Sequence, residues 1–219
     1  MTRPVFHARA VLFDWDGTLL DSYASDARSY LAMFRALGIP WSLDDLKLHY
    51  SPNWLRVYEA ANLPRDKWDE AYHLWHQAND NEHPELLPGA RHVVESLTSR
   101  FQLGIVTSGT RDRVRRQLDE FQLAQAFSVC VFAEDAPRRK PDPAPLELAL
   151  ERMGVQPRDS VYVGDTPEDV QMSRAAGVRA IGVFGPFPTA DALRASNPEI
   201  LLESIADLLS ILSLRGDSR

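Results

Sequence analysis

The sequence predicts an α/β fold, in which a parallel sheet is covered by helices on both faces and interrupted by one long helical insertion. Five short apolar segments have the length of buried strands, and segments of helical pattern lie between them. Such alternation is typical of parallel sheets. Four of the five apolar segments also end abruptly at polar residues, which favours a site at the carboxyl ends of the strands.

The first predicted strand, 11–13, is followed by two carboxylates one residue apart, Asp14 and Asp16, and by Gly17, which marks a turn. If strand geometry continues that far, both carboxylates point to the same side of the chain. Like charges so close need a cation or a shared proton between them. The pair therefore suits Mg²⁺, with one carboxylate as nucleophile and the other as proton carrier. The alternative is an Asp-rich turn without chemistry.

Residues 21–86 carry only helical signals and are far longer than a simple crossover requires. We therefore expect a helical cap domain over 21–86 and a catalytic core over 1–20 and 87–219. Proline, glycine and capping residues divide the insertion into four expected helices, which cover 21–37, a segment after the capping residues 42–45, about 53–62 and about 64–79.

The later strands are expected at 103–106, 129–132, 161–163 and 180–183. A final apolar tract, 200–214, is interrupted by Glu203 and Asp207 and is interpreted as an amphipathic packing helix. Because parallel strands open at one edge, the polar residues after the strands should share one pocket, namely Asp14, Asp16, Thr107, Lys140 and Asp165.

With these features the chain resembles the haloacid dehalogenase-like hydrolase superfamily, a large group of mostly Mg²⁺-dependent phosphatases. Four motifs carry the resemblance in order along the chain: Asp14-Trp15-Asp16-Gly17-Thr18, Thr107, Lys140-Pro141 and Gly164-Asp165-Thr166-Pro167-Glu168-Asp169. The resemblance implies a Rossmann-like, doubly wound sheet of order 5-4-1-2-3 with an all-helical cap. It also implies Mg²⁺ as the cofactor.

By this resemblance Asp14 is the nucleophile and forms an aspartyl phosphate, while Lys140 and Mg²⁺ offset the repulsion between carboxylate and phosphate. Lys140 has the alternative of a solvated surface charge beside two arginines. Asp16 would protonate the leaving alkoxide and later deprotonate water. The main-chain carbonyl of Asp16 and the side chains of Asp14 and Asp165 would bind the metal directly. Asp169 would bind it through a water molecule.

Thr107, with Ser108 and Gly109, could hold phosphate oxygens beside the start of the next helix. Ser108 or Thr110 could instead only cap that helix. Gly17 and Thr18 are further candidates for phosphate binding, because they let the chain turn tightly out of the pocket. Asp169 also fits a capping box with Thr166, so it has both a structural and a metal-binding interpretation.

Within the superfamily, haloacid dehalogenases lack an acid at the position of Asp16, whereas this chain keeps one. This implies a phosphatase of the phosphoglycolate phosphatase type acting on a small phosphorylated metabolite, with a sugar phosphomutase of the β-phosphoglucomutase type as the alternative. A non-catalytic small-molecule-binding protein on the same fold is a weaker alternative. No glycine-rich loop of a nucleotide-binding module is present.

In the insertion, Asn53 and Arg56 are candidate substrate contacts, because the corresponding loop of related capped phosphatases faces the core. Asn53 could equally be only a helix cap, and Arg56 only a surface cation.

The net charge of −7 disfavours nucleic acid as a partner, and no segment predicts a membrane association. A single cysteine and the lack of a secretion signal favour the cytoplasm. Both a monomer and a homodimer are compatible with the sequence.

Overall fold

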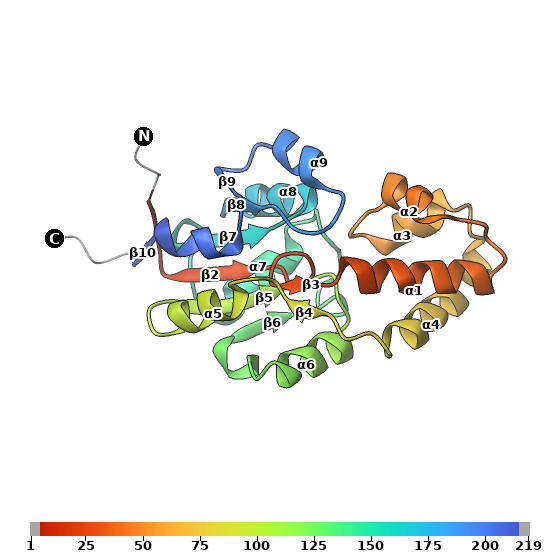
Figure 1. Cartoon of the computed structure of the whole chain (residues 1–219). Helices are drawn as coiled ribbons and strands as arrows, with labels where there is room; N and C mark the ends of the chain where they lie inside the picture. Colours follow the sequence, from red (N-terminus) through yellow and green to blue (C-terminus); the bar gives the residue numbers. More distant parts are fainter. Residues whose placement is uncertain (1–4, 215–219) are drawn as a thin grey trace. The chain divides into compact units, whose positions relative to one another are not determined.

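The computed structural model describes residues 5–214 of the 219-residue chain, and they form two compact units (Figure 1). Residues 22–85 form a helical unit, and the described residues on either side of them form an α/β unit. The strands β3 (Leu20–Asp21) and β4 (Glu85–Leu86) pair with each other where the chain leaves the α/β unit and returns to it.

The α/β unit is built on a sheet in which every strand pairs in parallel with its neighbour. Its order within the described residues is β6 (Val129–Val131), β5 (Gln102–Val106), β2 (Ala10–Phe13), β7 (Ser160–Gly164), β8 (Arg179–Val183) and β9 (Ile200–Leu202). The first five of these strands have the order that the resemblance implied, so that prediction is confirmed. The unpredicted strand β9 extends the sheet beyond β8.

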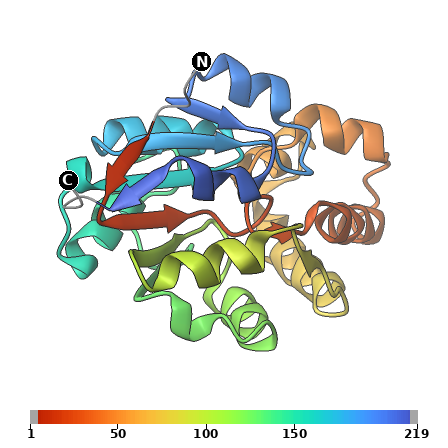
Figure 2. The same ribbon diagram turned by 60° about the vertical axis from the view of Figure 1, so that its left-hand side comes forward.

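Helices cover both faces of this sheet, as Figure 2 shows. Along β2, Val11 and Phe13 belong to one apolar core, whereas Ala10 and Leu12 belong to the other, because side chains alternate along a strand. The first core is completed by α5 (Ala90–Thr98), α6 (Arg111–Glu120) and the 3₁₀ helix η4 (Ile205–Ser210), and the second by α7 (Ala144–Met153) and α8 (Pro167–Ala175). Smaller elements are η2 (Ala124–Ala126), η3 (Pro157–Asp159) and α9 (Ala190–Ala195).

The expectation of one amphipathic helix over 200–214 is wrong. The chain there forms β9, then η4, and then β10 (Leu212–Leu214), which pairs in parallel with β1 (Phe6–Ala8). The hydroxyl of Ser204 accepts a hydrogen bond from the amide of Ala206 (3.3 Å) and starts η4 after a turn. Short apolar runs are ambiguous between strand and helix, and here the free edges of β8 and β1 decided the outcome.

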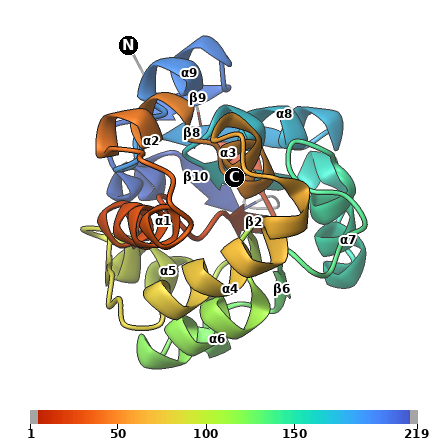
Figure 3. The same cartoon turned by 90° about the vertical axis from the view of Figure 1, so that its right-hand side faces the viewer.

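The helical unit contains α1 (Tyr23–Ala36), α2 (Leu43–His49), α3 (Trp54–Ala60), η1 (Arg65–Lys67) and α4 (Trp68–Asn79), which Figure 3 shows. Helices were predicted at all four α-helical positions. The predicted capping box at Ser42 is present, and Asn53 caps α3 by accepting from the amide of Leu55 (3.2 Å). The helix expected from Pro64 begins with the 3₁₀ turn η1 instead. No helix within residues 5–214 is both long and apolar enough to cross a membrane.

Candidate active site

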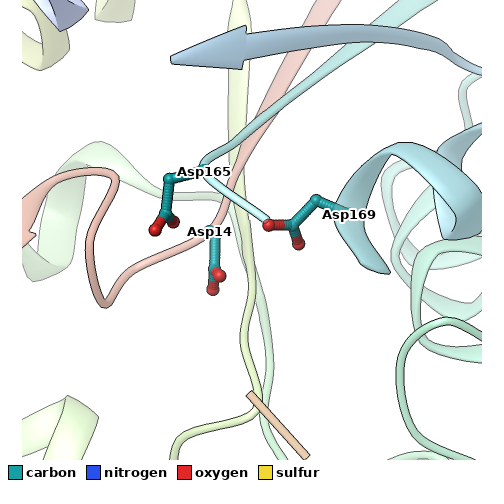
Figure 4. Close-up of side chains that lie close together, drawn as sticks. All are labelled: Asp14, Asp165 and Asp169. Carbon is teal, nitrogen blue, oxygen red and sulfur yellow. The ribbon is translucent and has the colours of Figure 1, made fainter. Parts of the chain in front are cut away.

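Three aspartates lie together at the carboxyl ends of two neighbouring strands (Figure 4). Asp14 follows β2, Asp165 follows β7, and Asp169 lies in the first turn of α8. The strands bring them together, because Phe13 pairs with Val163 and the amide of Asp14 donates to the carbonyl of Val163 (2.9 Å). One carboxylate oxygen from each aspartate lies within 4.8 Å of the others, and all three side chains are buried.

The side chain of Lys140 lies in contact with this carboxylate cluster. Its Nζ is 3.0 Å from Asp14 Oδ1 and 2.8 Å from Asp169 Oδ1. It also donates to the hydroxyl of Tyr162 (2.7 Å), which in turn donates to the carbonyl of Val106 (2.7 Å). Lys140 is only 4% exposed, so the alternative of a solvated surface charge is wrong.

A single ammonium group does not balance the buried carboxylates. Burial, together with the charges of Asp169 and Asp16, raises the pKa of Asp14 to about 7 against the opposing effect of Lys140. Burial and the charges of Asp14 and Asp169 likewise hold the pKa of Asp165 well above its ordinary value. Burial alone would lower the pKa of Lys140, but Asp14 and Asp169 outweigh it and raise that pKa.

The oxygens of Asp165 differ in their surroundings. Oδ1 accepts a hydrogen bond from the hydroxyl of Thr18 (2.8 Å), whereas Oδ2 is buried and accepts none from residues 5–214. Gly17, whose φ is +77°, leaves space beside it, since a Cβ there would lie 2.4 Å from Oδ2. A buried carboxylate oxygen without a donor, beside two more carboxylates, fits a hard cation such as Mg²⁺.

Asp169 has partners for both of its oxygens. Oδ2 accepts from the amide (3.1 Å) and the hydroxyl (2.7 Å) of Thr166, and the Thr166 hydroxyl accepts from the Asp169 amide, which completes the predicted capping box. Oδ1 accepts from Lys140. The structural interpretation of Asp169 is therefore confirmed, and its action on a metal through water stays a prediction.

Asp16 lies apart from this cluster. Strand β2 ends at Phe13, so the alternation that would align Asp14 with Asp16 does not continue. Both oxygens of Asp16 accept from Arg113 on α6, at 2.9 Å and 2.6 Å. The two aspartates of the first motif therefore face two different cations.

Thr107 lies at the end of β5, next to the start of α6. Its hydroxyl oxygen accepts from the amide of Gly109 (3.0 Å), which leaves the hydroxyl proton for another acceptor. Thr110 stands at the helix N-cap, but its side chain makes no capping bond, so the capping interpretation of Thr110 is wrong. The carboxylate of Glu134 instead accepts from the amide of Arg111 (3.2 and 3.1 Å). The contact of Ser108 with a phosphate stays a prediction.

Sequence reasoning missed Arg113 and Tyr162. Arg113 is one of four arginines in six residues, a pattern that is typical of a solvated helix face. The four-residue spacing of Gly109, Arg113 and Gln117 is a signal that could have placed it on one face toward the pocket. Tyr162 was counted only as a strand residue. Asn53 and Arg56 belong to the helical unit, and their contact with a substrate stays a prediction.

Comparison with known proteins identifies the family. Residues 11–183 match the model of the family described as haloacid dehalogenase-like hydrolase, and the chain belongs to this family. It is 32% identical over 211 residues to the pyrophosphatase PpaX of Bacillus velezensis, with 94% of this chain and 97% of the relative covered. It is 29% identical to the phosphoglycolate phosphatase of Escherichia coli, with 94% and 93% covered. The prediction that the protein is a phosphatase of this family is confirmed.

Solved structures share the fold. A protein from Haemophilus somnus described as a predicted phosphoglycolate phosphatase superposes with a TM-score of 0.83 at 22% identity, covering 93% of this chain and 97% of that one. CbbY from Rhodobacter sphaeroides, solved in complex with phosphate, has a TM-score of 0.80 at 21% identity, covering 93% of this chain and 99% of that one. At these identities the likeness concerns the architecture alone.

Proposed function

We propose that the protein hydrolyses phosphomonoesters of small metabolites with Mg²⁺, through a covalent aspartyl phosphate on Asp14. The observation that carries this proposal is the environment of Asp14. Its carboxylate is buried at a strand end, 3.0 Å from the ammonium group of Lys140, in one cluster with Asp165, whose Oδ2 accepts no hydrogen bond from residues 5–214. A carboxylate held next to fixed positive charge is suited to attack an anionic phosphoryl group.

In the first step a carboxylate oxygen of Asp14 forms a bond to phosphorus while the bond from phosphorus to the ester oxygen breaks. Lys140 offsets the charge that gathers on the phosphoryl oxygens, and the hydroxyl of Thr107 donates to one of them. Asp16 gives its proton to the leaving alkoxide. In the second step Asp16 takes a proton from water, which attacks phosphorus and restores the Asp14 carboxylate.

The residues that would hold the cation are the carboxylates of Asp14 and Asp165 and the main-chain carbonyl of Asp16, with Asp169 acting through water. When bound, Mg²⁺ supplies positive charge that offsets the mutual repulsion of these carboxylates and the phosphate. Thr18 keeps one oxygen of Asp165 engaged, so that the other is oriented for the cation.

The substrate we propose is a small phosphate ester of the phosphoglycolate or sugar-phosphate type. The insertion carries six Lys or Arg against eleven Asp or Glu, a balance that suits a small ligand better than a polyanion. Inorganic pyrophosphate is a second candidate, supported by the similarity to the pyrophosphatase PpaX. Two neighbouring structures named β-phosphoglucomutase keep a phosphomutase as the alternative reaction.

The test is a panel of phosphoglycolate, sugar phosphates, inorganic pyrophosphate and p-nitrophenyl phosphate, each assayed with Mg²⁺ and with EDTA. Release of inorganic phosphate that needs Mg²⁺ supports the proposal. The preferred compound then identifies the substrate class. Conversion of a sugar phosphate into its isomer without release of phosphate would support the mutase instead.

A further inference from the structure

The contact between Arg113 and Asp16 is a two-point contact of the α/β unit that the proposed mechanism leaves unused. The guanidinium donates from Nη1 to Asp16 Oδ1 (2.9 Å) and from Nη2 to Asp16 Oδ2 (2.6 Å). The side chains are only 10% and 23% exposed. Such two-point contacts fix the plane of a carboxyl group as well as its position, which a lysine cannot do.

The guanidinium is itself held by its surroundings. The side-chain oxygen of Gln117 accepts from Arg113 Nη1 (3.4 Å) and from the indole of Trp15 (2.9 Å), which is fully buried and precedes Asp16 in the chain. Gly109 leaves the necessary space, because a Cβ there would lie 2.5 Å from Arg113 Nη2. Helix α6 is thus bonded to the loop of the first motif at both residues 15 and 16.

We propose that Arg113 is a positioning residue that holds the carboxyl group of Asp16 where it exchanges a proton with the leaving group. The inference rests on the proposed function. The guanidinium only donates hydrogen bonds, so it fixes the carboxyl group of Asp16 without taking the proton that goes to the leaving alkoxide. Without Arg113, the two contacts that fix the plane of the Asp16 carboxyl group from α6 are lost.

The experiment compares Arg113→Met and Arg113→Lys with Arg116→Met, which removes an exposed arginine from the same helix. The measured quantity is kcat/KM for 2-phosphoglycolate, phenyl phosphate and p-nitrophenyl phosphate, whose leaving groups need progressively less proton assistance. Because kcat/KM includes only the steps up to loss of the alcohol, the role of Asp16 in hydrolysis of the phosphoenzyme does not enter it.

We expect Arg113→Met to lower kcat/KM about 10- to 100-fold for 2-phosphoglycolate but less than about threefold for p-nitrophenyl phosphate, with phenyl phosphate between them. Arg113→Lys should restore only part of the loss, since it keeps the charge but not the two-point contact. Arg116→Met should match the wild type on all three esters.

A double-mutant cycle supplies the second measurement. In an Asp16→Asn background, Arg113→Met should cause little further loss on 2-phosphoglycolate, because the group that Arg113 positions is already gone. Equal losses on the three esters, no loss on any, or a full additional loss in the Asp16→Asn background would each overturn the positioning role. A wild-type protein that hydrolyses neither these three esters nor any sugar phosphate with Mg²⁺ would instead overturn the proposed function, and this inference with it.

Discussion

The two units differ in the polar side chains that they bury, because within residues 5–214 only the α/β unit buries charged ones. In the α/β unit, Lys140 and three aspartates are almost completely enclosed, and one carboxylate oxygen accepts no hydrogen bond from residues 5–214. In the helical unit, ion pairs lie at the surface, as between Arg28 and Glu82, whose side chains are 61% and 19% exposed. Its buried amide, Asn79, donates to the hydroxyl of Ser29 (3.1 Å), which donates to a carbonyl.

This difference reflects two requirements on a folded chain, which are stability and a functional site. Four of the five tryptophans and five of the six tyrosines lie within 22–85, so the helical unit is stabilised by the packing of aromatic rings. The α/β unit keeps like charges together at a cost in stability, which is expected where a site must meet a cation and an anionic substrate. Substitutions in the two units should therefore have different effects on activity and on stability.

The largest expected effect is that of Asp14→Asn in the α/β unit. Turnover of every substrate should fall by several orders of magnitude, because an amide cannot form the aspartyl phosphate. The fold should persist, since the side chain keeps its size and one charge is removed from a repulsive cluster. Steady-state kinetics and circular dichroism check both parts. Hydrolysis at nearly the wild-type rate would exclude the covalent mechanism.

Asp165→Asn should affect stability in the opposite direction from activity. Replacing a buried carboxylate whose Oδ2 accepts no hydrogen bond from residues 5–214 should stabilise the metal-free protein by about 1–2 kcal/mol, or about 2–8 °C in Tm. Activity should be lost, together with the rise in Tm that Mg²⁺ produces in the wild type. Thermal unfolding with and without Mg²⁺ measures both. A less stable metal-free variant that still responds to Mg²⁺ would contradict the metal site.

The same cluster predicts a dependence of stability on pH. Burial raises the pKa of Asp14 from 3.8 to about 7, so the folded state binds its proton more tightly than the unfolded state does. That contribution is complete below about pH 4 and is lost as the pH rises toward 7. Because Mg²⁺ must displace the proton, its stabilising effect should be larger at pH 8 than at pH 5.5. An equal shift in Tm at both values would show that the carboxylates do not bind the ion.

The two capping boxes allow a matched comparison in which the expected effects are smaller. Ser42 and Asp45 form one at the surface of the helical unit, and Thr166 and Asp169 form the other inside the carboxylate cluster. Ser42→Ala should lower Tm by about 2–4 °C and leave kcat unchanged. Thr166→Ala should lower Tm by a similar amount and also reduce kcat, because Asp169 loses a donor while it contacts Lys140. Unchanged kcat in Thr166→Ala would assign Asp169 a structural role alone.

The smallest expected effect is that of Arg56→Ala, an exposed residue of α3. If the helical unit selects the substrate, the KM of the best carboxylate- or phosphate-bearing substrate should rise about three- to tenfold. Values for p-nitrophenyl phosphate should barely change, because this ester offers the cap no second anionic group. Equal effects on both substrates, or none, would remove Arg56 from substrate selection.

The sequence alone determined the class of the fold, the strand order through a family resemblance, and the residues at the strand ends. These features are local: apolar runs, helix caps and the residues that directly follow a strand are visible in a window of a few positions, as at Asp14 and Asp165. The Thr166–Asp169 capping box was predictable for the same reason, because both partners lie within one helical turn.

Only the tertiary structure decided which partner each charged side chain takes. Asp16 and Arg113 are 97 residues apart and meet through the packing of α6 beside the first motif, so the spacing along α6 can indicate the face of Arg113 but not its partner. The tract 200–214 is another case, since strand or helix depended on the edges offered by β8 and β1. Contacts between distant segments depend on the whole fold, because the partner and its free hydrogen-bonding groups exist only once the chain has packed.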